Sequence, residues 1–585
     1  MIVGIDLGTS TSLVAAIKDG VPTLVLNERG KTITPSVVGF SETGELLVGE
    51  SAKNQAVAHP DRTIGSIKRI MGSDKRVTLM GKEYTPQEIS AMILNKLKND
   101  AEAYFGKVAD EAVITVPAYF TDAQRQATKD AGEIAGFKVE RIINEPTAAA
   151  LAYGFQHKEE ISNLLVYDYG GGTFDVSIIQ LVEGAFKVLA TSGNNMLGGD
   201  DFDEIVSQFL FDKFKAAEGI DLKEIKDDQM KLSIHQRIRE AAERAKIDLS
   251  TLLETNVNIP FLYSVGGDPK HLDVNITRAE LEKMTKSLVE ATRQPVIDAL
   301  AASRVAESDL DAVILVGGTT RIPAVKKFIT GLLKKEPLSD IHPEECVAVG
   351  AAVQAGVKAG ELDDLVVVDV APYTLGIEVV GDRFSPIIYA NTTIPCSQKR
   401  RYVTTQDYQQ EATINVLQGN HKKASRNTDL GEFVLAGLSQ KAKGETVVEV
   451  VFDYDVNGIV NVTAIDRETG ARNNIVIKQS RERLSDAQKA AAKEHLSSVV
   501  GTESDIERIE TIEDRSPAQI EAEFYINDAT NFLMDRGNDI DAVLREQIEQ
   551  TISILQESIS KKDDAQIDSM SDKLLMLLSD ADVQG

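Results

Sequence analysis

Two short stretches of the chain combine carboxylates with glycine and hydroxyl residues between apolar runs. Residues 6–10 read Asp-Leu-Gly-Thr-Ser, and residues 168–175 read Asp-Tyr-Gly-Gly-Gly-Thr-Phe-Asp. In each case a second apolar run follows, which predicts two strands joined by a tight turn. Glycine-rich turns bring backbone N–H groups close to phosphate oxygens, and flanking carboxylates suit a metal-bound nucleotide. For either stretch alone, a glycine-rich hairpin without a ligand is an equally good interpretation.

Two hairpins of this design in one chain predict a duplicated domain with one phosphate site per half. A third glycine turn, Gly317-Gly318, follows the apolar run 312–316, and its backbone could approach a flat ring with Arg321 stacked on one face. There is no GxxxxGK[ST] motif, no histidine pair with metal-ligand spacing, and no nucleophile signature around Cys346 or Cys396. The pattern therefore favours nucleotide hydrolysis with a hydrated Mg²⁺ over P-loop, zinc or thiol chemistry.

The segments that must position these residues alternate between strand and helix up to about residue 360. The patterns predict helices over 85–106, from Asp122, from Glu145, throughout about 200–300, and over 344–359, with buried strands at 112–117 and 141–144. This alternation predicts an α/β domain of two similar lobes around a cleft. Glu145, at a strand-to-helix junction, can orient a water molecule, although most such glutamates only cap a helix.

The pattern changes after an apolar segment at 365–369, which predicts either a buried strand or a docking linker. Short strands then follow between turn residues, which predicts an all-β domain, a sandwich; they lie at 376–380, 402–405, 412–416, 447–452 and 458–463. From about residue 485 the chain becomes helical and acidic, with helices expected near 517–537, 541–560 and 563–580.

Composition limits the classes of partner. A chain of 585 residues is too long for one core and should form about three or four domains. The net charge of −28 disfavours nucleic acid and anionic membranes as partners and favours basic or apolar ones. Two cysteines, no long apolar run and no basic leader lead us to expect a cytoplasmic protein that binds neither nucleic acid nor membrane.

Four long motifs, at 6–9, 143–150, 168–175 and 316–323, resemble the signatures of the seventy-kilodalton heat-shock protein family, and the bacterial DnaK-type chaperones are the best match. The similarity runs from residue 1 to about 480 and includes Asn-Thr-Thr-Ile-Pro at 391–395. It implies an actin-like (duplicated ribonuclease H-like) ATPase domain at 1–362, a linker at 363–369, a β-sandwich substrate-binding domain at 370–482 and a helical lid at 483–585. The implied function is an ATP-dependent molecular chaperone for protein folding and stress response.

The resemblance also implies roles around the nucleotide. Lys68 would hold the γ-phosphate and the attacking water, Glu145 would orient that water, and Thr173 would lie beside the γ-phosphate. Asp6, Asp168 and Asp175 would organise the metal ions, Mg²⁺ through water and K⁺, and Asp6 and Asp168 also count as catalytic. The implied ATP and ADP contacts are Gly8, Thr9, Ser10, Gly170, Gly171, Gly172, Glu243, Lys246, Ser250, Gly317, Gly318 and Arg321.

The same resemblance implies an allosteric cycle in which ATP docks the linker and opens the lid, and hydrolysis reverses both changes. The implied coupling residues are Pro117, Arg125, the J-domain contact Arg141, and the linker residues Leu365, Val366, Val367, Val368 and Asp369. Extended hydrophobic segments of unfolded proteins would bind at Ile377, Val380, Tyr402, Thr405, Ala412 and Ile414. The implied partners are such polypeptides, a J-domain co-chaperone and a GrpE-type nucleotide exchange factor.

Several positions depart from the family pattern. Tyr169 replaces a leucine and Thr319 a serine, and both changes should leave nucleotide binding intact. Ala412 replaces the usual valine of the central peptide pocket, while Val380 and Thr405 replace the usual Met and Ala of its arch, which predicts a wider pocket. The short, divergent tail keeps open a specialised paralogue with few clients. A sugar kinase or a cytoskeletal polymer of the same ATPase fold would need neither the linker nor the all-β domain.

Overall fold

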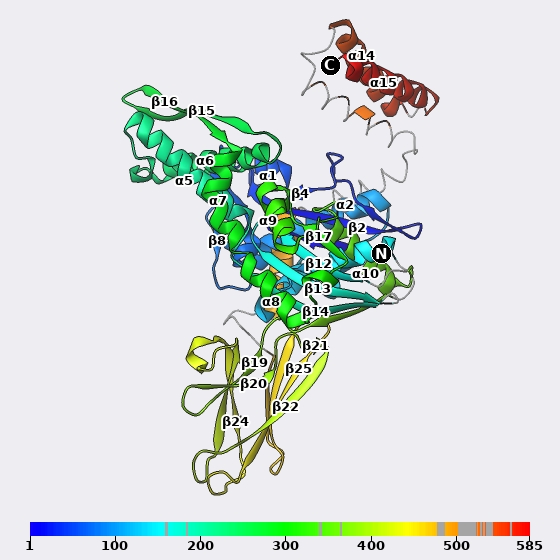
Figure 1. Cartoon of the computed structure of the whole chain (residues 1–585). Helices are drawn as coiled ribbons and strands as arrows, with labels where there is room; N and C mark the ends of the chain where they lie inside the picture. Colours follow the sequence, from blue (N-terminus) through cyan, green and yellow to red (C-terminus); the bar gives the residue numbers. More distant parts are fainter. Residues whose placement is uncertain are drawn as a thin grey trace. The chain divides into compact units, whose positions relative to one another are not determined.

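The computed structural model in Figure 1 describes most of the chain. The described residues are 1–157, 162–182, 185–338, 342–362, 365–476, 486–500, 542–561 and 564–584, with Ala522, Tyr525, Ile526, Ala529 and Leu533. The chain divides into two compact units. One comprises residues 1–25, 34–98 and 109–500, and the other comprises residues 26–33, 99–108 and 501–585.

Two six-stranded sheets of the first unit share the same strand directions over part of their width. The first runs β11 (Lys138–Asn144), β10 (Glu111–Val116), β1 (Ile2–Leu7), β2 (Thr11–Lys18) and β3 (Val21–Leu24), with β4 (Thr34–Pro35) against β2. The second runs β17 (Ala312–Val316), β12 (Ser162–Tyr169), β13 (Phe174–Val182), β14 (Ala185–Asn194), β18 (Val366–Val370) and β21 (Thr393–Ile394). β1 is parallel to β10 and antiparallel to β2, as β12 is to β17 and β13. Both expected hairpins are confirmed, and the repeated order agrees with a duplicated domain.

Helices around these sheets hold the site in place. The expected helix at 85–106 and strand at 112–117 are confirmed as α2 (Pro86–Phe105) and β10. Thr121 caps α3 (Asp122–Ile134) in a capping box with Gln124, so Asp122 is the first-turn acid. α4 (Glu145–Gln156) and α10 (Cys346–Ala359) pack closely, since a Cβ on Gly350 would collide with the Ala148 carbonyl. Small residues therefore allow two helices to meet beneath the site.

The expectation that residues 200–300 are all helical is wrong. α5 (Gly199–Glu218), α6 (Asp228–Thr251), α7 (Arg278–Glu290) and α8 (Arg293–Ser303) are present, but the hairpin of β15 (Glu254–Val265) and β16 (Asp268–Thr277) separates them. Val257 and Ile259 are buried while Asn256 and Asn258 are exposed, which is the alternation of a strand. Gly266 and Gly267 turn the hairpin with φ of 58° and 89°.

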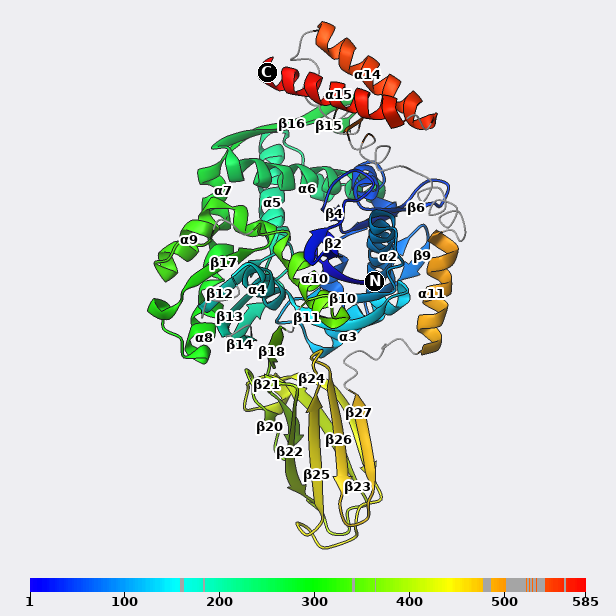
Figure 2. The same ribbon diagram turned by 90° about the vertical axis from the view of Figure 1, so that its right-hand side faces the viewer.

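Residues from about 371 to 476 form the expected β-sandwich (Figure 2). One sheet is β20 (Arg383–Ile388), β19 (Leu375–Val379), β23 (Glu411–Gln418) and β24 (Thr428–Ala436); the other is β22 (Cys396–Val403), β25 (Val447–Tyr454), β26 (Val460–Asp466) and β27 (Arg472–Val476). Both sheets contribute to one core that includes Val416, Leu430 and Phe452. β20, β24 and β27 were not predicted, and the strand expected at 402–405 is only the end of β22. β22 is a polar edge strand, so its sequence lacks an apolar signal.

The apolar segment 365–369 joins the α/β part of the first unit to the β-sandwich. Its strand β18 runs parallel to β14, with Val366 opposite Ala185, and antiparallel to β21 (Figure 2). Two further hydrogen bonds connect the parts: the Val460 amide donates to Asp122 Oδ1 at 2.8 Å, and the Ile142 amide to Asn457 Oδ1 at 3.1 Å. The linker predicted at 363–369 is therefore largely a strand of the second sheet, while residues 363 and 364 lie outside the described residues.

Helices follow the sandwich. In the first unit, α11 (Asp486–Val500) contacts α3, where Lys489 lies 2.5 Å from Asp130 and 2.7 Å from Glu133. In the second unit, α14 (Ala542–Ser560) and α15 (Asp564–Gln584) pack on each other and confirm the helices expected at 541–560 and 563–580. The helix expected at 517–537 lies largely outside the described residues. Among the described helices, none is both long and apolar enough to cross a membrane.

Candidate functional site

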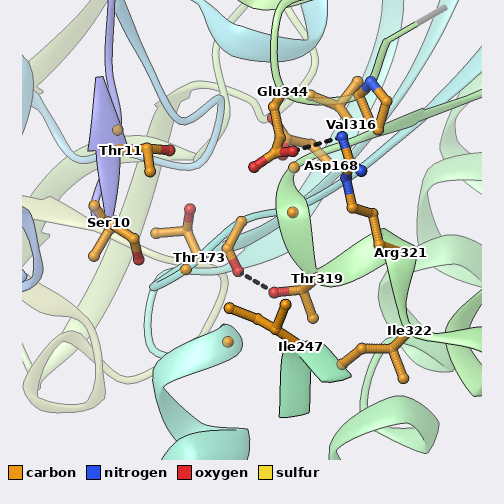
Figure 3. Close-up of a pocket in the computed structure, with 18 of the residues that line it drawn as sticks. Ser10, Thr11, Asp168, Thr173, Ile247, Val316, Thr319, Arg321, Ile322 and Glu344 are labelled. Atoms are coloured by element: carbon orange, nitrogen blue, oxygen red, sulfur yellow. Dashed lines mark hydrogen bonds and ion pairs between the residues drawn. The ribbon is translucent and has the colours of Figure 1, made fainter. Parts of the chain in front are cut away.

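The two glycine hairpins and the third glycine turn meet at one cavity of about 680 Å³ (Figure 3). Of the implied catalytic, ATP-contacting and metal residues, all but Gly172 and Asp175 line it. Those that do are Asp6, Gly8, Thr9, Ser10, Lys68, Glu145, Asp168, Gly170, Gly171, Thr173, Glu243, Lys246, Ser250, Gly317, Gly318 and Arg321. The structure thus brings together residues that are more than 300 positions apart in the sequence.

Glycine is required where the two hairpins approach each other. A Cβ on Gly171 would collide with the Ser10 hydroxyl oxygen, and a Cβ on Gly172 would lie 2.9 Å from Thr9 Oγ1. The carbonyls of Gly170 and Gly171 accept hydrogen bonds from the first amides of α5, those of Gly199 and Asp200, at 3.0 and 2.8 Å. These contacts hold the turn 170–173 against the start of α5. Gly172 does not line the cavity and instead packs against Thr9 of the first hairpin.

Lys68 and Glu145 form a buried ion pair in the cavity. Lys68 belongs to the short helix η2 (Ile67–Ile70), and its Nζ lies 2.6 Å from Glu145 Oε1. The two residues are 4% and 8% exposed, and the ammonium also lies 5.6 Å from the centre of the Phe120 ring. Glu145 is the first residue of α4, as expected, but its carboxylate pairs with a lysine as well. The pair places a cation and a base side by side with little water around them.

Two carboxylates, the half-buried Asp6 and the buried Asp168, lie near the ends of β1 and β12 at the same cavity. Burial and then the charge of Glu145 raise the pKa of Asp6 to about 7, while Thr115 donates to its Oδ1 at 3.1 Å. Burial, followed by the neighbouring carboxylates, raises the pKa of Asp168 well above its usual range. Each group holds its proton more tightly because negative charge is concentrated in a region with little solvent.

Asp175 lies behind the cavity wall. Its Oδ1 accepts a 3.0 Å hydrogen bond from the Tyr119 amide, and its buried Oδ2 has no hydrogen-bond partner among the described residues. Burial raises the pKa of Asp175 to about 8. Asp6, Asp168 and Asp175 thus concentrate negative charge, and one oxygen of Asp175 has no partner among the described residues. Such a group is suited to a hydrated divalent cation. Within the described residues, no three His, Cys, Asp or Glu side chains cluster closely enough to coordinate a metal ion directly.

α6 supplies the opposite wall of the cavity with Glu243, Lys246 and Ser250. Lys246 Nζ lies 2.7 Å from Asp203 Oδ1 and 3.3 Å from the Gly199 carbonyl oxygen. Burial raises the pKa of Asp203 to about 6, although Lys246 opposes this shift. Glu243 pairs at 3.1 Å with Lys53 of α1 (Glu50–Gln55). Sequence reasoning missed Lys53 and Asp203, because no local motif marks contacts with residues that lie 190 and 43 positions away.

Arg321 closes the cavity at the third glycine turn. Gly317 has a φ of 83°, and a Cβ there would press on the Tyr169 carbonyl, so the turn lies tightly against β12. The short helix η5 (Gly318–Arg321) follows, and Thr319 Oγ1 donates to the Gly170 carbonyl at 2.8 Å. Arg321 NH2 lies 2.7 Å from Glu344 Oε2 (Figure 3). Glu344 and the apolar Ile247 also line the cavity and were not predicted.

The implied coupling residues form hydrogen bonds between the cavity and the linker. Arg125 donates to Asn144 Oδ1 at 2.6 Å, and Asn144 Nδ2 donates to Asp369 Oδ2 at 2.7 Å. Asn144 is adjacent to Glu145. Arg141 donates to Gln354 Oε1 at 3.0 Å, and Pro117 is buried at the end of β10. In the linker, Leu365 and Val367 pack on the core beneath the second sheet, Val368 pairs with Lys187, and Val366 is exposed.

Four of the six implied peptide contacts share the sandwich core. Ile377 and Ile414 are buried in it, and Tyr402 and Ala412 pack against it. The Tyr402 hydroxyl lies 3.0 Å from Ser385 Oγ, which fixes the ring from its polar end. Val380 and Thr405 are exposed instead, and the Thr405 amide donates to Gln409 Oε1 at 3.0 Å.

One comparison with known proteins agrees with the sequence motifs. The chain matches the family model described as Hsp70 protein over residues 2–78 and 74–582. The match spans both glycine hairpins, the linker, the sandwich and the helical tail. Members of that family are chaperones that bind and hydrolyse ATP with Mg²⁺.

Proposed function

Because the chain belongs to the Hsp70 family, we propose that it is an ATP-dependent chaperone of DnaK type that binds and releases extended apolar segments of unfolded proteins. The observation that carries this proposal is the Lys68–Glu145 pair, enclosed between two glycine hairpins that share one cavity. A cavity of about 680 Å³ is within the usual range for a site that binds a molecule the size of a nucleotide.

The chain's own residues account for ATP binding. The turns 8–10 and 170–173 would hold the phosphates from opposite sides, and α6 and η5 would enclose the nucleoside between Ile247 and Arg321. A bound Mg²⁺ would neutralise charge on the phosphates, and Asp6, Asp168 and Asp175 would hold it through water, which suits their raised pKa values. A K⁺ ion at the same carboxylates is part of this proposal.

Hydrolysis requires a water molecule aligned with the γ-phosphate. Lys68 would contact a γ-phosphate oxygen and stabilise the charge that develops there. Glu145, 2.6 Å from Lys68, would orient the water and accept its proton, and the Thr173 hydroxyl would position the phosphate. Because the ion pair is buried, its charges act with little screening by solvent.

Coupling to the sandwich is supported by the docked linker. Asp369 contacts Asn144, which is adjacent to Glu145. A change around the γ-phosphate would act on Glu145, and release of β18 would act on Asn144, so both events would affect neighbouring residues. In the proposed cycle, ATP favours this docked arrangement and fast peptide exchange, and hydrolysis releases the linker. A J-domain protein that binds at Arg141 and a GrpE-type nucleotide exchange factor would be the partners that regulate this cycle.

A chaperone and a sugar kinase differ in the molecule that they bind besides ATP, which is a peptide for the chaperone and a sugar for the kinase. Turnover of ATP by the full chain is measured with and without an apolar peptide, and separately with sugars. Stimulation by the peptide supports the chaperone, whereas turnover that depends on a sugar would establish a kinase and reject the proposal. A peptide array then separates a general stress-response chaperone from a specialised paralogue, because a paralogue should bind few sequences.

A further inference from the structure

His342 contacts the arginine that closes the nucleotide cavity. Its Nε2 lies 3.0 Å from Arg321 NH2, and the same Arg321 nitrogen lies 2.7 Å from Glu344 Oε2. The contact with His342 is a hydrogen bond, whereas the contact with Glu344 is an ion pair. Because the hydrogens of a guanidinium lie in its plane, the hydrogen bond to His342 adds a directional constraint to the ion pair and orients that plane.

The contact requires a neutral imidazole with its proton on Nδ1. The guanidinium of Arg321 can only donate, so Nε2 must accept and the proton of the neutral ring is on Nδ1, which lies 3.6 Å from Glu345 Oε2. Among the described residues, the charged groups linked to the ring are Arg321, from η5, and Glu344 and Glu345, just before α10. Protonation would turn Nε2 into a donor facing another donor and would place two positive charges together.

Building on the ATP site proposed above, we propose that His342 is a positioning residue that holds the Arg321 guanidinium for stacking on the nucleotide base. Arg321 is 49% exposed, so without a second acceptor its long side chain would sample many rotamers around the Glu344 contact. Stacking of a guanidinium on a ring is favourable only when the guanidinium lies over the face of the ring, with the two planes roughly parallel. His342 therefore strengthens binding of the base and leaves binding of the phosphates unchanged.

The test compares a ligand with a base and one without it. Dissociation constants of the full-length chain for ADP and for inorganic pyrophosphate, both with Mg²⁺, are measured at one fixed pH. The ratio of the two constants cancels effects on the phosphate site and leaves the contribution of the nucleoside. The ratio for the native chain is the reference for the variants.

Two substitutions separate the role of the acceptor from that of the side chain. His342→Leu removes the acceptor, and ADP binding should weaken about three- to tenfold, with pyrophosphate binding unchanged. His342→Gln supplies an amide oxygen at a similar distance from the backbone, so it should restore tight ADP binding. His421→Gln, in the sandwich, is the matched control.

The outcomes are distinct. The inference is wrong if His342→Leu binds ADP as tightly as the native chain does, or if His342→Gln binds ADP as weakly as His342→Leu. A native chain that binds neither ADP nor pyrophosphate would instead overturn the proposed ATP site. An equal loss for ADP and pyrophosphate would show that His342 acts on the whole fold, which would also contradict the inference.

Discussion

The hydroxyl of Tyr373 donates a 2.7 Å hydrogen bond to the backbone carbonyl of Tyr119, and the two ring centres lie 4.4 Å apart. Tyr373 follows β18 and precedes the first strand of the sandwich. On its other side, the Tyr119 amide donates to Asp175 at 3.0 Å. The entry to the sandwich is thus two hydrogen bonds away from a carboxylate that would organise the metal. This route is separate from the contact between Asn144 and Asp369.

Removing only the hydroxyl tests this route. Tyr373→Phe keeps the ring but removes the part-buried hydrogen bond to the Tyr119 carbonyl, worth about 0.5–1.5 kcal/mol. We expect the stimulation of ATP turnover by an apolar peptide to fall roughly two- to tenfold, because the docked arrangement becomes less populated. Tyr408→Phe, at a tyrosine that is 67% exposed, is the control. Equal stimulation in both variants would show that the Tyr373 hydroxyl plays no part in coupling.

Lys68 should be needed for hydrolysis and not for nucleotide binding. Lys68→Ala removes the cation that would stabilise the γ-phosphate in the transition state, and a loss of about 100-fold or more in turnover is expected. ATP binding should remain, because the glycine turns and α6 make most of the contacts. Single-turnover hydrolysis and equilibrium binding are measured on the same sample.

The exposed Lys75→Ala is the control for that experiment. Because Lys68→Ala leaves Glu145 without its partner, thermal unfolding of the variant is also recorded, to show that the chain is folded. Normal turnover by a folded Lys68→Ala variant would contradict the assigned role.

Features that depend on residues close together in the sequence were predicted, whereas features that depend on distant residues were not. Gly171 and Asp168 were predicted from local motifs, because a phosphate turn needs its residue types within a few positions. Asp203 and Glu344 were not, since each contributes through a side chain that only the fold brings to the cavity. The hairpin β15–β16 was missed because strongly helical sequences on both sides dominate the pattern. Whether residues 365–369 form a buried strand or a docking linker was left open, since the two have the same composition.

The sandwich contains an ion-pair cluster that predicts how it responds to acid. Glu449 of β25 is 1% exposed and lies near three cations, with Arg467, Arg401 and Lys399 at 2.5, 3.3 and 3.7 Å. Its hydrogen bonds with Arg467 hold the pKa of Glu449 below its usual value. A carboxylate with a depressed pKa stabilises the folded state above its unfolded pKa of about 4.3, and this contribution disappears as the pH falls through the lower folded value.

Glu449→Gln should therefore destabilise the sandwich at neutral pH and have little effect in strong acid, where the native carboxylate is protonated. Urea unfolding of the full chain, measured across pH and at low and high salt, checks this expectation, and high salt should reduce the difference. Glu445→Gln changes an exposed glutamate nearby and should leave the profile unchanged. A constant difference between native and Glu449→Gln at every pH would rule out the charge as the cause.

The central peptide pocket should be wider than is usual in the family, because Ala412 replaces a valine. Ala412 is only half-buried and packs against the same core as Tyr402, whose hydroxyl lies 3.0 Å from Ser385 Oγ. The tethered ring is therefore not free to rotate into the space that the missing methyl groups leave. Large side chains such as Phe or Met should fit this space better than Leu.

Ala412→Val should fill the pocket and reverse that preference. Added methyl groups in an apolar pocket typically change affinity by about 1–3 kcal/mol, so binding of a Phe-centred peptide should weaken roughly tenfold relative to a Leu-centred one. Ala436→Val makes the same change at an exposed position of the adjacent strand β24, opposite Glu411, and should alter neither affinity. Fluorescence anisotropy with the two peptides measures the ratio directly. If Ala412→Val leaves the affinity for a Leu-rich peptide and this ratio as they are in the native chain, residue 412 does not determine the width of the pocket.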